Sequence, residues 1–458
     1  MLKLSNIKIQ TMPRQRFLLY ILPVIFLSLS ACSGLTQKPS SYPSMPPSQQ
    51  VWVSEFGSPE LTKLVAEAML NNPSLQASLA RVEANRARAA ISGAEMLPNI
   101  QANFGTDRSR SSMFGQTRTE SRFTLGADIS WEADLWQRAT HRKRAAIADA
   151  TASKEDFHAA QLLLAADIAK GWFQAVESKS QQQLANRRVE SFKNTIEVIS
   201  ERYRAGIGEA LDVHLARENL ATAQARLASR EQKLDAAKRT LEVLIGRYPN
   251  AELKLGRSLP KLKSTVPAGL TSGLLQRRPD ILAAEQKLMA STERLRDSEA
   301  NFLPKLRLTA SGGTATDKLK NLLDWDNLIW SIGASLIQPI FQGGRLKAEQ
   351  VLASSNNHEA IANYGQAVSN AFREVETALA AEPLLARQET HQTTANTESQ
   401  QAAGLALSRY SAGLTEIITL LDTQRRSFNV ESTLLETRLS QLLNRINLHL
   451  ALGGSFTP

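Results

Sequence analysis

The chain has little of what disulfide frameworks, metal sites and catalysis require. Among 458 residues there is one cysteine, Cys32, which excludes a disulfide framework and any paired-cysteine metal or redox site. The six histidines are scattered without metal-ligand spacing, and the sequence contains no nucleophile elbow, P-loop or dinucleotide-binding glycine pattern. We therefore expect no enzymatic activity, no cofactor and no resident metal.

Aromatic residues and clustered charge are also scarce. Phe, Trp and Tyr make up 6% of the chain, which favours long, closely packed helices over an all-β body. The formal net charge is +10, but four of these charges come from basic residues in the segment 1–31, which has no acidic residue. The remaining surplus is spread thinly and includes no basic cluster, so we expect no nucleic-acid partner.

The amino terminus has the pattern of an export signal. Arg14 and Arg16 precede an apolar run, 17–29, which is too short to span a bilayer but suits a secretory signal. The run ends in Leu29-Ser30-Ala31-Cys32, which resembles the lipobox of bacterial lipoproteins. We expect residues 1–31 to be a lipoprotein signal peptide and Cys32 to carry lipid. The alternative is an ordinary cleaved signal with an incidental cysteine.

The segment after the cysteine predicts a membrane-anchored tether. Ser33 is not aspartate, which, by the same resemblance to lipoproteins, favours the outer membrane. Four prolines between residues 38 and 50 indicate an extended chain. Residues 32–60 are therefore expected to form a lipidated tether, and the mature protein is expected to work outside the cytoplasm.

The rest of the chain is an internal duplication. Asn72-Pro73 followed by Leu97-Pro98 is echoed, at the same spacing, by Arg278-Pro279 and Leu303-Pro304. Further along, an Arg-Tyr-x-Ala-Gly turn occurs once in each half. Repeated landmarks in the same order predict two copies of one unit, at 61–247 and 270–454, joined by a linker at 248–269.

Each unit reads as a helix, two strands and two very long helices. Residues 61–93 favour a helix that restarts at Pro73, whereas residues 123–134 alternate apolar and polar side chains, as do 330–337. Shorter alternating runs begin at Ile100 and Leu306, which makes four strands of about ten residues, the length of a tilted membrane strand. A soluble sheet that covers a core is the alternative.

Four membrane strands cannot close into a barrel alone. Every backbone polar group in lipid must be paired, so an open sheet would leave two costly edges. Several chains must therefore combine. Two chains would give eight strands and a filled interior, and three would give twelve strands and a lumen. The periodicity does not choose between three and four chains.

The remaining segments predict coiled-coil helices. No proline interrupts Gln137 to Tyr203. Leucines recur every seven residues from Leu220 to Leu241, and the same spacing links Leu414, Leu421, Phe428, Leu435 and Leu442. Glycines within 202–209 and 409–416 allow the chain to reverse.

These features together resemble the TolC-like outer membrane efflux protein family, in its lipoprotein branch. The resemblance covers about residues 50–454. It rests on Asn71-Asn72-Pro73-Ser74-Leu75, Trp131-Glu132-Ala133-Asp134-Leu135-Trp136, Gln338-Pro339-Ile340-Phe341-Gln342-Gly343-Gly344-Arg345 and the two Arg-Tyr-x-Ala-Gly turns. It implies a mostly α-helical homotrimer with a coiled-coil helical barrel in the periplasm and a twelve-stranded transmembrane β-barrel. Such a trimer is the exit duct of a tripartite exporter with a periplasmic adaptor and an inner-membrane pump.

The resemblance also implies two kinds of functional residue. Asp422 matches the place of a family carboxylate that would form a ring and constrict the periplasmic end. Asp212 in the first unit is the counterpart of Thr419 in the second. The turns would be the tips where the adaptor docks, through Tyr203, Ala205, Gly206, Tyr410, Ala412 and Gly413. The plainer interpretations are a solvated helix-face aspartate and glycines needed only for chain reversal.

Other functional classes fit less well. A trimeric coiled-coil lipoprotein without a pore would need no alternating strands between its helices, and a periplasmic enzyme would need a clustered polar site. The outer membrane component of a type I protein secretion system shares the expected architecture and remains an alternative.

Overall fold

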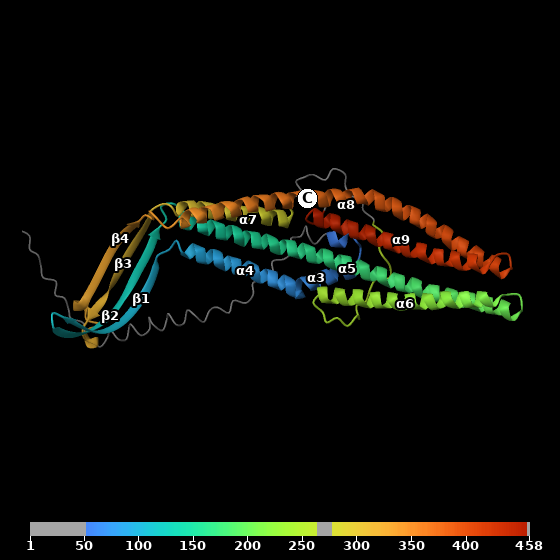
Figure 1. Cartoon of the computed structure of the whole chain (residues 1–458), viewed down its shortest axis with the longest axis horizontal. Coiled ribbons are helices and arrows are strands. Elements are labelled where there is room, and N and C mark those ends of the chain that lie inside the picture. Colours follow the sequence, from blue (N-terminus) through green and yellow to red (C-terminus); the bar gives the residue numbers. More distant parts are fainter. Residues whose placement is uncertain (1–51, 263–276, 456–458) are drawn as a thin grey trace, which may run out of the picture. The chain divides into compact units, whose positions relative to one another are not determined.

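The computed structural model describes residues 52–262 and 277–455 (Figure 1). The expected signal peptide, Cys32, most of the tether and part of the linker lie outside these residues. The first half contains α3 (Pro59–Asn71), α4 (Pro73–Ala94), β1 (Asn99–Met113), β2 (Gln116–Ala133), α5 (Arg138–Arg204) and α6 (Ala210–Leu244). The second contains α7 (Pro279–Ala300), β3 (Lys305–Thr316), β4 (Leu328–Ile337), α8 (Arg345–Ser411) and α9 (Ile417–Ala451).

The two halves repeat the same elements at the same lengths. Helices α4 and α7 each have 22 residues, α5 and α8 each have 67, and α6 and α9 each have 35. Pro73 and Pro279 occupy the first positions of α4 and α7, where a missing N–H costs nothing. The Asn72 side chain caps α4 by accepting from the Leu75 amide at 3.0 Å.

The strands form one antiparallel sheet in the order β1-β2-β3-β4. Residues directly opposite one another lie on the same face of a sheet. The register places Ile129 opposite Ile100 and Ala310, and it places Asp128 opposite Gln101 and Ser311. The sheet therefore has one apolar and one polar face, and β1 and β4 are its edges within the chain.

Three strands are longer than the expected ten residues. β1 has 15 residues, β2 has 18 and β3 has 12, while β4 has ten. The extra length of the first hairpin comes from a two-residue turn, Phe114-Gly115, whose φ angles of 50° and 79° match the strand twist. This turn lets pairing continue to Met113 and Gln116 through a polar stretch that apolar alternation does not mark.

The long helices pack as hairpins. α5 lies beside α6 and α8 lies beside α9, and α5 also packs against α4, α7 and α9 (Figure 1). Both turns end their first helix in the same way. Gly206 and Gly413 have φ angles of 72° and 75°, and the amides of Ile207 and Leu414 bond back to the carbonyls of Arg202 and Arg409.

Two clusters of buried side chains hold these hairpins together. The larger cluster joins the segment before α3 to α3, α4, α5 and the ends of α6 and α9, and it includes Trp52, Phe157 and Phe173. The second cluster lies near the turns, where Phe192, Ile199 and Leu420 join α5 to α9. No helix in the described ranges is both long and apolar enough to cross a membrane.

Candidate functional site

A polar contact joins the two helical hairpins next to their turns. Tyr410, in the last turn of α8, donates from its hydroxyl to Asp212 Oδ2, in the first turn of α6, at 3.4 Å. Tyr410 is 4% exposed. Burial, and then the charge of Asp212, raise the pKa of Tyr410, so the phenol stays protonated and remains a donor.

Arg202 fastens the same place from the first hairpin. Its Nη1 donates to the carbonyl oxygens of Tyr410 and Ser411, each at 3.2 Å. Its guanidinium carbon lies 5.2 Å from the centre of the Tyr410 ring, a cation–π distance. The last turn of α8 is therefore held between Arg202 on α5 and Asp212 on α6.

Asp422 makes a different set of contacts. Its two carboxylate oxygens accept from Arg425 Nη2 at 2.7 Å and from Arg426 Nε at 2.6 Å, both on its own helix α9. The bond from Arg425, followed by that from Arg426, lowers its pKa despite opposing desolvation. Within the part of the chain that the structure describes, Asp212 contacts the other hairpin and Asp422 does not.

The turns expose apolar side chains at matching positions. Ile207 and Leu414, one residue after each left-handed glycine, are 65% and 67% exposed, and Leu211 and Ile418 are exposed four residues further on. Tyr203, Ala205, Gly206, Ala412 and Gly413 are exposed, whereas Tyr410 is buried. Of the six residues expected at the tips, five are therefore on the surface, and Tyr410 faces the opposite hairpin.

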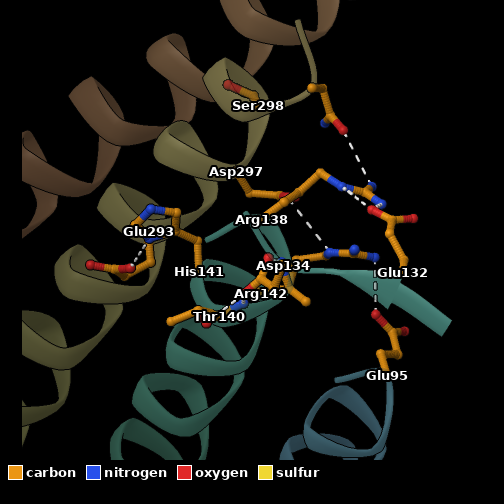
Figure 2. A network of polar contacts seen from close by, with 12 residues as sticks. Glu95, Glu132, Asp134, Arg138, Thr140, His141, Arg142, Glu293, Asp297 and Ser298 are labelled. Carbon is orange, nitrogen blue, oxygen red and sulfur yellow. Dashed lines mark hydrogen bonds and ion pairs between the residues drawn. The ribbon is translucent and has the colours of Figure 1, made fainter. Parts of the chain in front are cut away.

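A second polar region connects the sheet to the helices (Figure 2). Asp134, just after β2, accepts from the amides of Ala139 and Thr140 at 2.8 and 2.9 Å and from the Thr140 hydroxyl at 2.6 Å. It thus caps α5, whose own N-cap residue, Gln137, makes no such bond. Burial alone would raise the pKa of Asp134, but these hydrogen bonds and Arg138 lower it.

Arginines on the first turns of α5 tie this cap to its neighbours. Arg138 bonds to Glu132 on β2 and, at 3.4 Å, to Asn301 after α7. Arg142 pairs with Glu95 at 2.9 Å and with Asp297 on α7 at 3.5 Å (Figure 2). The network therefore joins the start of α5 to β2 and to the ends of α4 and α7, where the helices meet the sheet.

The tryptophans of the same motif brace the adjoining loops. Trp131 Nε1 donates to the Met96 carbonyl after α4 at 2.9 Å, and Trp136 Nε1 donates to the Pro304 carbonyl after α7 at 2.8 Å. This explains in physical terms why the segment 131–136 carries two tryptophans and two acids.

Sequence reasoning did not single out Arg202, Arg138 or Arg142. Arg202 and Arg409 stand at the same place in the two turns, so the sequence offers no signal that only Arg202 reaches across. Arg138 and Arg142 are four residues apart and follow two acids, Glu132 and Asp134, which is a signal of a helix start with paired charges. Among the described residues there is no group of three or more His, Cys, Asp or Glu that could hold a metal ion.

A sheet with two open edges, long hairpin helices and paired turns joined by polar contacts are the features expected of an outer membrane channel subunit. The outer membrane efflux protein model matches residues 64–247 and 270–454, and the chain belongs to this family. It is 32% identical over 415 residues to the pyoverdine export outer membrane protein OpmQ of Pseudomonas aeruginosa, covering 88% of this chain and 87% of the relative.

Two further comparisons agree. The chain is 28% identical over 406 residues to the cation efflux system protein CusC of Escherichia coli, covering 88% of each. The solved structure of the outer-membrane channel OprN matches with a TM-score of 0.85 and 26% identity, covering 92% of this chain and 96% of that one. The TolC-like fold expected from the sequence is thereby confirmed, with its helical barrel and its strands for a β-barrel.

The expected function and location are confirmed with it. The protein is an outer membrane channel of a tripartite efflux system, with a long periplasmic helical domain. Its family consists of efflux channels.

Proposed function

We propose that three copies of this chain close into one duct, with the β1 edge of each copy paired to the β4 edge of the next. The open edges carry this proposal, because unpaired backbone groups in lipid are costly. The apolar face also supports it, since Ile100 and Phe104 on β1 and Ile332 and Leu336 on β4 are exposed. The duct has the repeats 61–247 and 270–454 as its structural units and acts by conduction alone, without cofactor or enzymatic activity.

Edge pairing is tested by cysteine cross-linking. One cysteine placed on β1, at Gln101 or Asn103, and one on β4, at Ser331 or Ser335, should give trimers on oxidation in membranes. Pairs with both cysteines on the central strands β2 and β3 are the matched control and should link only within a chain. Monomers or dimers alone from every edge pair would refute closure by three chains.

The periplasmic end of this duct is gated at the turns. The contacts of Tyr410 with Asp212 and Arg202 hold the second hairpin against the first, which keeps the end narrow. Three copies of Asp422 line the constriction as a carboxylate ring that favours cations. Opening requires the hairpins to separate, and the polar contacts between them are the ones that break.

The adaptor protein docks on the exposed tips. Tyr203, Ala205, Gly206, Ala412 and Gly413 form its surface together with Ile207 and Leu414, and Tyr410 supports that surface from below. Through this adaptor the duct receives substrates from an inner-membrane pump.

Lipid on Cys32, which becomes the first residue after cleavage of 1–31, anchors the tether 32–60 in the outer membrane.

Docking is tested with Ile207→Asp and Leu414→Asp, which place charge on an apolar surface without touching the buried contacts. Cross-linking to the adaptor in cells should fall sharply, while single-channel conductance of the purified protein stays unchanged. Leu319→Asp, at another exposed apolar site between β3 and β4, is the control. Unaltered adaptor cross-linking in both tip variants would remove the tips from the docking surface.

A further inference from the structure

Among the described residues, Arg188 on α5 is a buried cation without a carboxylate partner. The residue is 7% exposed, and its Nε is buried with no hydrogen-bond partner. Its one hydrogen bond within the described ranges is a long one, from Nη1 to Asn429 Oδ1 on α9 at 3.5 Å. A charge held away from water in this way is costly unless something neutralises it.

Aromatic rings enclose this guanidinium. Its central carbon lies 5.4 Å from the centre of the Phe192 ring on α5 and 5.8 Å from that of Phe428 on α9. The ring faces attract a cation weakly and fix its position, but they supply no counter-charge. The rings thus hold Arg188 in place without neutralising it.

The charged groups that act most on Arg188 are themselves cations. Burial first, and then the charges of Arg226 on α6 and Arg425 on α9, lower the pKa of Arg188 to about 10. No acid contributes to that shift. Two acids on α9 already form ion pairs with other residues. Asp422 pairs with Arg425 and Arg426, and Glu431 pairs with Arg187.

Hydrogen bonds between the helices place Arg226 and Arg425 at the level of Arg188. Asn429, which Arg188 contacts, is one helical turn from Arg425 on α9, and Arg230, one turn from Arg226 on α6, donates to Ser432 on α9 at 3.5 Å. Three arginines from three neighbouring helices thus leave a surplus of positive charge here. Arg226 and Arg425 are exposed, so a solute can reach them, while Arg188 supplies a desolvated donor. The planar fork of arginine matches carboxylate and phosphate oxygens, and such charge-assisted bonds are the strong ones.

We propose that Arg188, Arg226 and Arg425 form a binding site for an oxyanion, the carboxylate or phosphate group of a small solute. The bound group would sit where α5, α6 and α9 meet and would supply the charge that Arg188 lacks. The site goes beyond the proposed gating and docking, and it requires neither of them.

The test uses the full-length protein purified in detergent. Thermal unfolding is followed while citrate or inorganic phosphate replaces chloride at constant ionic strength, so that the two arms separate carboxylate from phosphate. A ligand that binds only the folded state raises the melting temperature with the logarithm of its concentration once that concentration exceeds Kd. We expect such a rise with at least one of the two anions.

Three variants assign this response to the cluster. Arg226→Gln, on the surface, should weaken the apparent affinity about tenfold, as expected for one lost charge-assisted contact. Arg188→Met should abolish the response and raise the melting temperature without anion, because it removes an unpaired buried charge. Arg187→Met, next in the sequence but paired with Glu431, is the matched control and should respond like the unmodified protein.

Several results would overturn the site. They are the absence of any greater stabilisation by citrate or phosphate than by chloride, an unchanged affinity in Arg226→Gln, and an equal loss in Arg187→Met. If Arg188→Met does not fold, Arg226→Gln and Arg187→Met still decide between a binding site and a packing role. Channel conductance, measured in parallel, tests the proposed duct independently.

Discussion

Tyr410 on α8 donates a hydrogen bond to Asp212 on α6, so the two helical hairpins of one chain are joined beside their turns. Tyr203, which has the corresponding place in the first turn, is 49% exposed. The duplication in sequence is therefore not a duplication of roles. One hairpin contributes the acid and the arginine, and the other contributes the buried tyrosine.

Replacing Tyr410 by Phe should open the periplasmic end more often. The change removes one long hydrogen bond to a carboxylate, worth about 1 kcal/mol, which corresponds to roughly a fivefold shift in a closed-to-open ratio. The measurement is open probability in planar bilayers. Tyr203→Phe, at the exposed equivalent position, is the control and should behave like the unmodified channel. Equal open probability in Tyr410→Phe and the control would remove this contact from gating.

Asp422→Ala should raise leakiness and weaken block by multivalent cations, because it removes the proposed carboxylate ring and leaves Arg425 and Arg426 without their shared partner. The lowered pKa of Asp422 adds a pH test. The carboxylate stays charged at pH values below the ordinary pKa of aspartate. Cation block in the unmodified channel should therefore persist as the pH falls through about 4. Unchanged conductance and block in Asp422→Ala would exclude Asp422 from the mechanism.

Asp134→Asn should destabilise the start of α5, since an amide cannot accept all three bonds that the carboxylate accepts. Loss of a helix cap costs about 1 kcal/mol. Because the folded-state pKa of Asp134 is lowered, its contribution is present above the unfolded value of about 3.9 and is lost as the pH falls through the folded value.

Thermal unfolding between pH 7 and pH 2 checks this prediction. The variant should melt lower at pH 7 and lose less stability on acidification than the unmodified protein. Asp317→Asn, on an exposed residue after β3, is the control. A variant with an unchanged melting temperature at pH 7 would show that the cap does not limit stability.

Cys32→Ser should abolish acylation, because the proposed lipid attaches to this thiol and the chain contains no other cysteine. Incorporation of a fatty-acid probe in cells is the measurement, and Ser33→Ala is the control that should remain labelled. Labelling that persists in Cys32→Ser would place the lipid elsewhere.

The sequence by itself determined the architecture. Local sequence signals predict helix starts, helix lengths and turns in both repeats, because each affects the backbone only a few residues away. These signals are the prolines, the heptad spacing of leucines and the glycines that end the helices. Alternation of side chains likewise predicts a two-faced strand wherever an apolar stripe is present. It did not predict the full lengths of β1 and β2, because their outer halves are polar and are paired through the turn at Phe114 and Gly115.

Only the tertiary structure decided which of two residues at matching positions makes the contact between the hairpins. Tyr203 and Tyr410 occupy matching positions, as do Arg202 and Arg409, yet one tyrosine is buried and one arginine reaches across. Asp422 is held by arginines of its own helix, while the Arg188 guanidinium lies over two aromatic rings and pairs with no acid among the described residues. Burial and the neutralisation of charge depend on which helix packs opposite, and residues about two hundred positions away along the chain supply that partner.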